Sequence, residues 1–233
     1  MSDDIKTQKE QIAGLYNRVA ATYDHVGPTV FSQFGQQVVD LLGISPGAQV
    51  LDVAAGRGAN LFPAAEKVAE TGRVVGIDLS EAMVQETRAA IKRKGLQNTS
   101  MLQMDAEDVT FDDASFDYVL CSFAYFFFPH LGRALSEFFR VLRPRGRLLV
   151  TLAGASDERW RWYEELLAVY HDRNNLLLAG PGGGRRLDPS EFKELLTHTG
   201  FTDTQSVPLE TEAIYADEQE WWSAKWTHGA RYP

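Results

Sequence analysis

Three aspartates, Asp52, Asp78 and Asp105, each lie at or near the end of a short apolar segment. They recur at nearly equal intervals, and each interval has room for one crossover between two parallel strands. The carboxyl ends of parallel strands line the ligand crevice of an open sheet, so the three carboxylates are expected to point toward one cleft. Carboxylates in such a place can accept strong, charge-assisted hydrogen bonds from the hydroxyl, amino or ammonium groups of a ligand.

A turn of small residues, Ala-Ala-Gly-Arg-Gly at 54–58, follows the first apolar segment. Small side chains let the backbone turn tightly and let a ligand approach it closely. Dinucleotide-binding turns have the pattern G-x-G-x-x-G, but the third glycine position here is Leu61. A nicotinamide-dependent oxidoreductase stays open as an alternative, because Asp78 follows Gly56 at the spacing of a ribose-binding acid.

Alternating elements must position these residues. Apolar runs predict strands, and helical spacing, Ser80 as an N-cap and glycine stops predict helices between them. This alternation is typical of βαβ units and a parallel sheet. The expected strands cover 49–54, 73–78, 99–104, 116–123, 147–153, 201–209 and 211–215, and the expected helices cover 5–21, 30–42, 60–70, 80–94, 130–142, 156–170, 189–198 and 217–228.

Composition limits the class of protein. The 233 residues are 44% hydrophobic and 24% charged, which fits a globular chain of one domain with an insertion. A net charge of −9 argues against nucleic acid as a partner. The single cysteine excludes a disulfide framework, the histidines show no metal-ligand spacing, and no apolar run reaches the length of a membrane span. We therefore expect a cytoplasmic protein without stable membrane insertion and without an obligatory metal.

Five blocks in order, at 50–58, 75–80, 104–106, 113–119 and 139–146, resemble the class I S-adenosylmethionine-dependent methyltransferases. The similarity is greatest to the small-molecule branch that includes the ubiquinone/menaquinone C-methyltransferases, and the segment 16–24 adds a further match. Two positions depart from the family pattern. Ala54 replaces the first glycine of the turn, where a positive φ is harder for alanine to adopt, and Arg145 replaces a glycine in a remote turn.

The resemblance implies a doubly wound, mostly parallel seven-stranded sheet of the Rossmann-like methyltransferase type. N-terminal helices and a helical insertion after strand 5 would complete it. The implied organisation is a helical lid (1–45), a cofactor-binding α/β core (46–155), a substrate-cap insertion (156–200) and C-terminal strands with a helix (201–233).

The implied cofactor is S-adenosyl-L-methionine, which leaves as S-adenosyl-L-homocysteine. Asp78 would accept the ribose hydroxyls, Asp105 the adenine amino group, and Asp52 would lie near the methionine ammonium. The full set of expected cofactor-binding residues is Tyr16, Tyr23, Asp52, Ala54, Ala55, Gly56, Gly58, Asp78, Leu79, Met83, Asp105, Ala106, Cys121 and Ser122.

The methyl acceptor is expected to be a small, largely apolar or aromatic molecule, methylated at C, O or N by in-line displacement. The expected pocket residues are Phe31, Phe34, Phe123, Tyr125, Phe126, Trp160 and Tyr163. Tyr23, His25 and His130 are candidates for a catalytic base, and the residues alone assign none of them. A relative that binds the cofactor without methyl transfer is a further alternative, and the aromatic C-terminal helix makes a homo-oligomer plausible.

Overall fold

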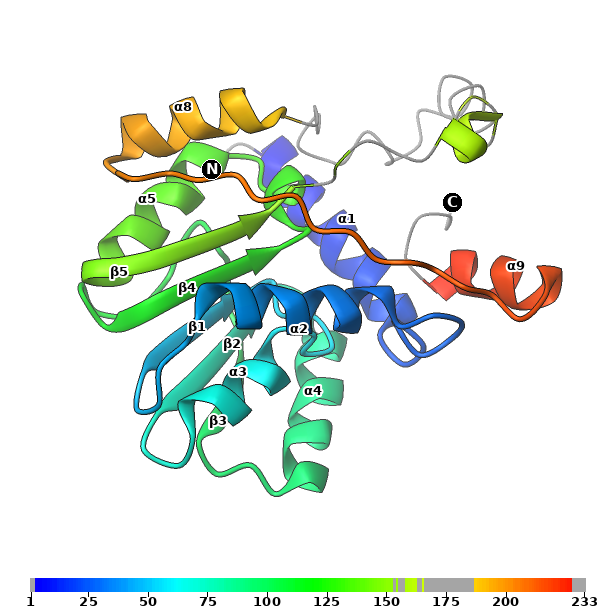
Figure 1. Cartoon of the computed structure of the whole chain (residues 1–233), viewed down its shortest axis with the longest axis horizontal. Coiled ribbons are helices and arrows are strands. Elements are labelled where there is room, and N and C mark those ends of the chain that lie inside the picture. The colour runs from blue at the N-terminus through cyan, green and yellow to red at the C-terminus, as the bar shows by residue number, and fades with distance from the viewer. Residues whose placement is uncertain (1–2, 153, 155–157, 163–164, 166–186, 228–233) are drawn as a thin grey trace.

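Five apolar segments pair side by side as parallel strands, in the order β3-β2-β1-β4-β5 (Figure 1). The computed structural model describes residues 3–152, 154, 158–162, 165 and 187–227. The strands are β1 (Gln49–Val53), β2 (Arg73–Asp78), β3 (Thr99–Gln103), β4 (Phe116–Ser122) and β5 (Leu142–Thr151). Every strand–strand pairing is parallel, as the alternation of strands and helices predicts.

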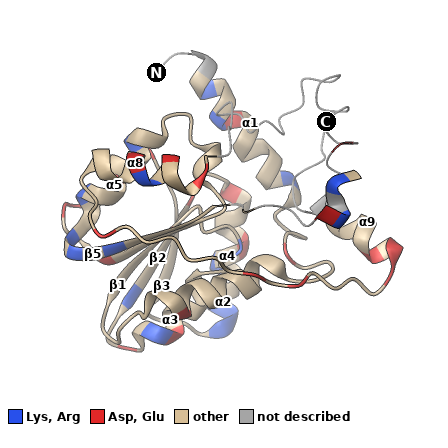
Figure 2. Ribbon diagram, turned by 45° about the horizontal axis from the view of Figure 1, so that its top comes forward, with Lys and Arg blue, Asp and Glu red and all other residues tan. Residues whose placement is uncertain are grey.

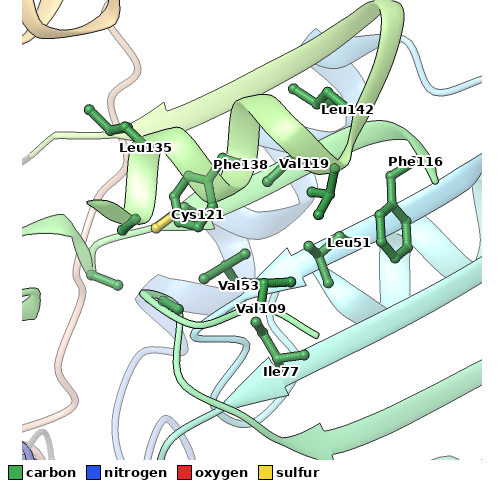
Figure 3. Close-up of a cluster of buried hydrophobic side chains, with 14 of the residues drawn as sticks. Leu51, Val53, Ile77, Val109, Phe116, Val119, Cys121, Leu135, Phe138 and Leu142 are labelled. Carbon is green, nitrogen blue, oxygen red and sulfur yellow. The ribbon is translucent and has the colours of Figure 1, made fainter. Parts of the chain in front are cut away.

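Helices cover both faces of this sheet (Figure 1). The described helices are α1 (Asp3–Val19), α2 (Val30–Leu42), α3 (Leu61–Val68), α4 (Glu81–Lys94), α5 (Leu131–Val141), α8 (Pro189–Thr199) and α9 (Glu218–Thr227), with short 3₁₀ turns η1 (Tyr125–Phe127) and η2 (Glu158–Trp160). Of these, α9 lies away from the sheet (Figure 1). Successive side chains of a strand point to opposite faces, so β1 serves two cores. Leu51 packs with residues of α5, as Figure 3 shows, and Val50 packs with residues of α2 and α3.

Local signals in the sequence set several helix ends. Ser80 accepts a hydrogen bond from the Met83 amide at the start of α4, and Gly95 ends this helix in the left-handed conformation. Asp188 and Glu191 form a capping box at the start of α8. The helices expected at 80–94 and 189–198 therefore form within a residue or so of their predicted bounds.

The strand order reverses between β1 and β4. The crossover from β1 leads to β2 on one side, and β4 then pairs with β1 on its other side. A reversal of this kind leaves a crevice at the carboxyl ends of the strands. Helix α1 lies across this end of the sheet (Figure 1).

The expected strands at 201–209 and 211–215 do not form, so the described sheet has five strands rather than seven. This segment runs as irregular chain from α8 past α2 (Figure 1). Most of it is exposed, and Pro208 has no amide hydrogen to donate to a ladder. Thr211 and the Glu210 carbonyl instead bond to glutamine side chains of α2.

Charged residues lie mainly on the helices and at the rims of the sheet (Figure 2). Within the described ranges, no helix combines the length and the apolar character needed to cross a bilayer. Most of the helix expected at 156–170 lies outside the described residues, so the substrate-cap insertion stays a prediction.

Close packing at Gly35 generates a stability prediction. A Cβ added there would lie 2.1 Å from the Ala59 carbonyl oxygen, whereas one added to Gly132 of α5 meets nothing within 4 Å. We expect Gly35→Ala to destabilise the protein by about 1–3 kcal/mol, because backbone must shift to relieve the overlap. Gly132→Ala, the matched control, should be neutral or stabilise by up to about 1 kcal/mol. Urea unfolding of both variants tests this, and equal stabilities would contradict it.

Candidate functional site

A cleft lies at the carboxyl ends of β1, β2, β3 and β4, beneath α1 and the segment that joins α1 to α2. It collects residues from the N-terminal helix, from the turn after β1, and from the ends of three strands. The lining residues that the sequence analysis expected are Tyr16, Tyr23, Phe31, Ala54, Ala55, Gly56, Asp78, Leu79, Met83, Asp105, Ala106, Ser122 and Phe123.

The turn after β1 is held from several sides. The Ala55 amide donates to the Ile77 carbonyl of β2, and Thr87 of α4 donates to the Gly56 carbonyl. Ala54 has φ 52°, so alanine adopts the left-handed conformation that glycine would adopt at less cost. A Cβ added to Gly56 would meet nothing within 4 Å, which leaves open space above this backbone.

Asp78 connects two of the loops that form the cleft. One carboxylate oxygen accepts the Gly56 amide at 2.8 Å, and the other accepts the Ser80 amide at 2.9 Å. Burial raises the pKa of Asp78, although these backbone hydrogen bonds act to lower it. Each carboxylate oxygen has a second lone pair, so Asp78 can still accept two hydroxyl groups from a ligand.

Asp105, in the loop after β3, also lines the cleft. One of its oxygens accepts the Glu107 amide at 2.9 Å, and the other is 2.6 Å from the ammonium of Lys9 on α1. Lys9 also contacts Glu107, again at 2.6 Å. No pattern in the sequence indicated this cluster, because a lysine on an amphipathic helix usually lies in solvent.

The loop after β3 that carries Asp105 is fixed by Arg140 of α5. This guanidinium donates to the carbonyls of Val109 and Phe111 and to the carboxylates of Asp113 and Glu137. These bonds explain why arginine stands in the block at 139–146. Although it is remote from the cleft lining, Arg140 fixes the path of the chain that leads away from Asp105.

Polar contacts tie α1 and the chain after it to the core at two further points. Asn17 accepts hydrogen bonds from the Ser80 hydroxyl and the Ala82 amide at the start of α4. The Arg57 guanidinium, in the turn after β1, donates to the Ala20 carbonyl. Arg57 and Lys9 also line the cleft, and the sequence analysis singled out neither residue.

Aromatic rings form a continuous wall on one side of the cleft. The rings of Tyr23 and Phe31 are stacked, with centroids 5.3 Å apart, and Phe31 meets Phe123 edge to face at 5.5 Å. Tyr16 contacts both Tyr23 and Phe127. Burial raises the pKa of both tyrosines, and the charge of Asp78 adds to this, so each phenol is a donor and not a base at neutral pH.

Asp52 lies behind the cleft rather than in its lining. Its side chain is fully buried and accepts a hydrogen bond from Asn60, whose own oxygen accepts the Ser122 hydroxyl. The second carboxylate oxygen of Asp52 has no hydrogen-bond partner among the described residues. Burial raises the pKa of Asp52 to about 7, and the charge of Asp78 contributes to this.

Several expected contact residues lie outside the cleft lining, for reasons of packing. Cys121 points into the core beside Phe138 (Figure 3), and burial raises the pKa of its thiol. The ring of Phe62 lies where a Cβ of Gly58 would stand, so this glycine serves close packing. Tyr125 is 2% exposed and packs on Phe192 of α8.

The remaining expected residues also lie away from the cleft. Phe126 packs on its neighbours in η1, and Phe34 packs behind Phe123. His25 and His130 are exposed and outside the lining, so their role as candidate bases stays a prediction. The side chain of Trp160 and the whole of Tyr163 lie outside the described residues.

Comparison with known proteins matches residues 50–146 to the methyltransferase domain family. Nocamycin O-methyltransferase from Saccharothrix syringae is 33% identical, over 93% of this chain and 81% of the relative. Aklanonic acid methyltransferase DauC from Streptomyces sp. (strain C5) is 39% identical over 61% of this chain, and the match spans 65% of the relative, just under two thirds. A ubiquinone/menaquinone biosynthesis C-methyltransferase from Hydrogenovibrio crunogenus is 33% identical over 63% of this chain and 59% of the relative.

Among solved structures, the YcgJ protein from Bacillus subtilis superposes with a TM-score of 0.57. It is 23% identical, and the match covers 72% of this chain and 68% of that one. This likeness shows the α/β Rossmann-like fold.

The buried carboxyl of Asp52 generates a pH prediction. Its folded-state pKa of about 7 exceeds the unfolded value of about 3.9. The unfolded chain therefore loses this proton first, and the free energy of unfolding falls as pH rises from about 4 to about 7. Asp52→Asn cannot ionise and keeps an oxygen for Asn60. We expect the stability of Asp52→Asn relative to the wild type to increase between pH 5 and pH 8. The increase should be roughly 1.4 kcal/mol for each pH unit between pH 5 and the folded-state pKa of about 7.

Urea unfolding of both proteins at the two pH values measures this difference directly. Comparison of the variant with the wild type cancels the titration of the other carboxyls. A constant difference between the two proteins would show that Asp52 titrates normally.

Proposed function

The chain belongs to the S-adenosylmethionine-dependent methyltransferases, and from this premise we propose that its cleft brings the methyl donor against a small, largely apolar or aromatic acceptor. The observation that carries the proposal is the arrangement of the cleft. Asp78, Asp105 and the open backbone at Gly56 lie along one cleft that also has an aromatic wall. The family match decides against the nicotinamide-dependent oxidoreductase that the sequence left open.

The residues present fit the cofactor. Asp78 has acceptor capacity for both ribose hydroxyls, and Asp105 for the adenine amino group. Leu79, Met83 and Ala106 line the same stretch and offer apolar contact to a purine. The exposed backbone around Gly56, with the buried Asp52 behind it, suits the methionine end of the cofactor. The ammonium there would favour the ionised form of the Asp52 carboxyl and so lower its raised pKa.

Bound S-adenosylmethionine supplies a methyl group that is already activated by a sulfonium, so the protein mainly has to orient the reactants and exclude water. Helix α1 and the aromatic wall would exclude water from the reacting end. Burial keeps the tyrosine phenols protonated, so they can orient an acceptor oxygen as donors but cannot remove its proton. The proposal therefore assigns no catalytic base.

The acceptor is proposed to be a flat aromatic or quinone-like molecule of the natural-product type. The stacked rings of Tyr23 and Phe31 and the edge contact to Phe123 provide apolar faces for such a ring. Two similar proteins carry the names nocamycin O-methyltransferase and aklanonic acid methyltransferase, which supports a small-molecule acceptor. Methyl transfer from radiolabelled donor to a panel of phenols, indoles and quinones tests this and distinguishes an enzyme from a relative that only binds the cofactor.

The organisation of the chain follows from the same proposal. Residues 1–45 would act as the lid, because α1 and the segment after it cover the cleft, and 46–155 would hold the cofactor. The exposed side chains of Ile214 and Trp222 are consistent with a homo-oligomer, which light scattering can test. A cytoplasmic location completes the proposal.

Asp78 holds two loops of the cleft and is proposed to accept the ribose hydroxyls, which generates a binding prediction. Asp78→Ala should weaken the binding of S-adenosylhomocysteine by about 1.5–3 kcal/mol, which is roughly 10- to 150-fold in Kd, because a hydrogen bond to a charged group is lost. Asp112→Ala, on an exposed loop outside the cleft lining, is the control and should bind as the wild type does. Calorimetric titration measures both, and a wild-type protein that binds no product would overturn the proposed function.

The aromatic wall generates a prediction about the acceptor. Phe31→Leu should raise the KM of the best acceptor from the panel about two- to tenfold, because an aromatic contact is lost. The Kd of S-adenosylhomocysteine should stay unchanged. Phe139→Leu, a half-exposed aromatic residue on α5, serves as the control. An unchanged acceptor KM in Phe31→Leu would remove Phe31 from the acceptor site.

A further inference from the structure

Lys9 of α1 occupies an unusual position for a lysine. It is only 8% exposed, it lines the cleft, and its ammonium lies 2.6 Å from both Asp105 and Glu107. Lysine is almost never this buried unless it is paired. Both partners follow β3, while Lys9 comes from the helix that covers the cleft, so the cluster joins the lid to the core.

Lys9 and Glu107 are nearly closed to water, whereas the Asp105 side chain is 28% exposed. Glu107 is 3% exposed, and its second oxygen accepts the His130 amide at 2.7 Å. Burial alone would lower the pKa of Lys9, but its hydrogen bonds to Asp105 and Glu107 outweigh this and raise it. The ammonium therefore stays charged, and removing it would leave two carboxylates close together with no cation between them.

Two further polar contacts of α1 and the residues just after it differ in kind. Asn17 uses an amide oxygen, and the contact with Arg57 uses the Ala20 carbonyl. The Asn17 amide oxygen and the Ala20 carbonyl are neutral, so each can exchange its partner for water at little cost. Separating the Lys9 ammonium from the buried Glu107 and the partly buried Asp105 costs more, because it leaves uncompensated charge at a buried site.

We propose that Lys9 is a positioning residue that latches α1 over the purine end of bound S-adenosylmethionine. The proposal rests on the proposed function, since it takes Asp105 as the acceptor of the purine amino group. The Asp105 carboxylate has lone pairs enough for both the ammonium and that amino group. The two ion pairs separate when the lid opens for cofactor exchange and reform when it closes.

Lys9→Met tests the latch, because methionine keeps much of the apolar stem and removes the charge. Lys6→Met is the matched control, since Lys6 lies on the same helix with its side chain 69% exposed. Radiolabelled S-adenosylhomocysteine, chased with unlabelled product, measures the dissociation rate. We expect the rate to rise about tenfold or more in Lys9→Met, in line with the loss of one partner of a buried ion pair, and to stay at the wild-type value in Lys6→Met.

Two further variants separate the charge of Lys9 from the packing of its apolar stem. Lys9→Arg keeps the charge and should return the dissociation rate most of the way to the wild-type value. Glu107→Gln removes one charge of the pair but leaves Asp105 intact, and should give an intermediate rate. Hydrogen exchange of the α1 amides in the ligand-free protein should be faster in Lys9→Met than in Lys6→Met.

The outcomes separate the two proposals. A wild-type protein that binds no S-adenosylhomocysteine would overturn the proposed function. Wild-type binding with equal dissociation rates and equal α1 exchange in Lys9→Met and Lys6→Met would overturn the latch alone. If Lys9→Met fails to fold, as judged by its thermal transition, Lys9→Arg and Glu107→Gln decide the question. Dissociation at the wild-type rate in Glu107→Gln would then overturn the latch.

Discussion

The carboxylate of Asp78 connects the two loops on which the whole cleft depends. It stands at the end of β2 and accepts amide hydrogens from Gly56, in the turn after β1, and from Ser80, at the start of α4. These bonds hold the small-residue turn against the neighbouring strand, and they leave lone pairs directed to a ligand. A parallel sheet makes this possible, because it brings the ends of β1, β2 and β4 to one edge.

Charged groups in the cleft lining and behind it are arranged in two different ways. Asp52 is buried with one oxygen unpartnered among the described residues, and its pKa rises to about 7 in consequence. Asp105 and Glu107 are compensated by Lys9 from the lid. The first arrangement leaves a free acceptor near the methionine end of the proposed cofactor site. In the proposed latch, the second arrangement would link the position of α1 to the purine end of the cofactor, so that cofactor binding and closure of α1 would form one equilibrium.

The aromatic residues show why the composition of a segment does not predict which of its side chains face a cleft. The run at 123–128 predicted an acceptor wall, but its members divide between different environments. Phe123 faces the cleft with Phe31, whereas Tyr125 is buried against α8. A short 3₁₀ turn lies within this run, so neighbouring residues point in unrelated directions. The expected C-terminal strands at 201–209 and 211–215 were wrong, because most of this segment is exposed and buries no apolar face against a core.

The sequence by itself determined the parallel α/β fold, the order of the core elements and the aspartates that end the strands, because these depend on local periodicity, caps and turns. It also predicted that Asp78 and Asp105 face one cleft, since a parallel sheet fixes where strand ends meet. Only the tertiary structure decided that Lys9 contacts Asp105, that Asp52 lies behind the cleft, and that His25 and His130 lie outside it. Contacts between residues nearly a hundred positions apart, such as Lys9 and Asp105, depend on how a helix packs across the sheet, and a pattern along the chain does not record that.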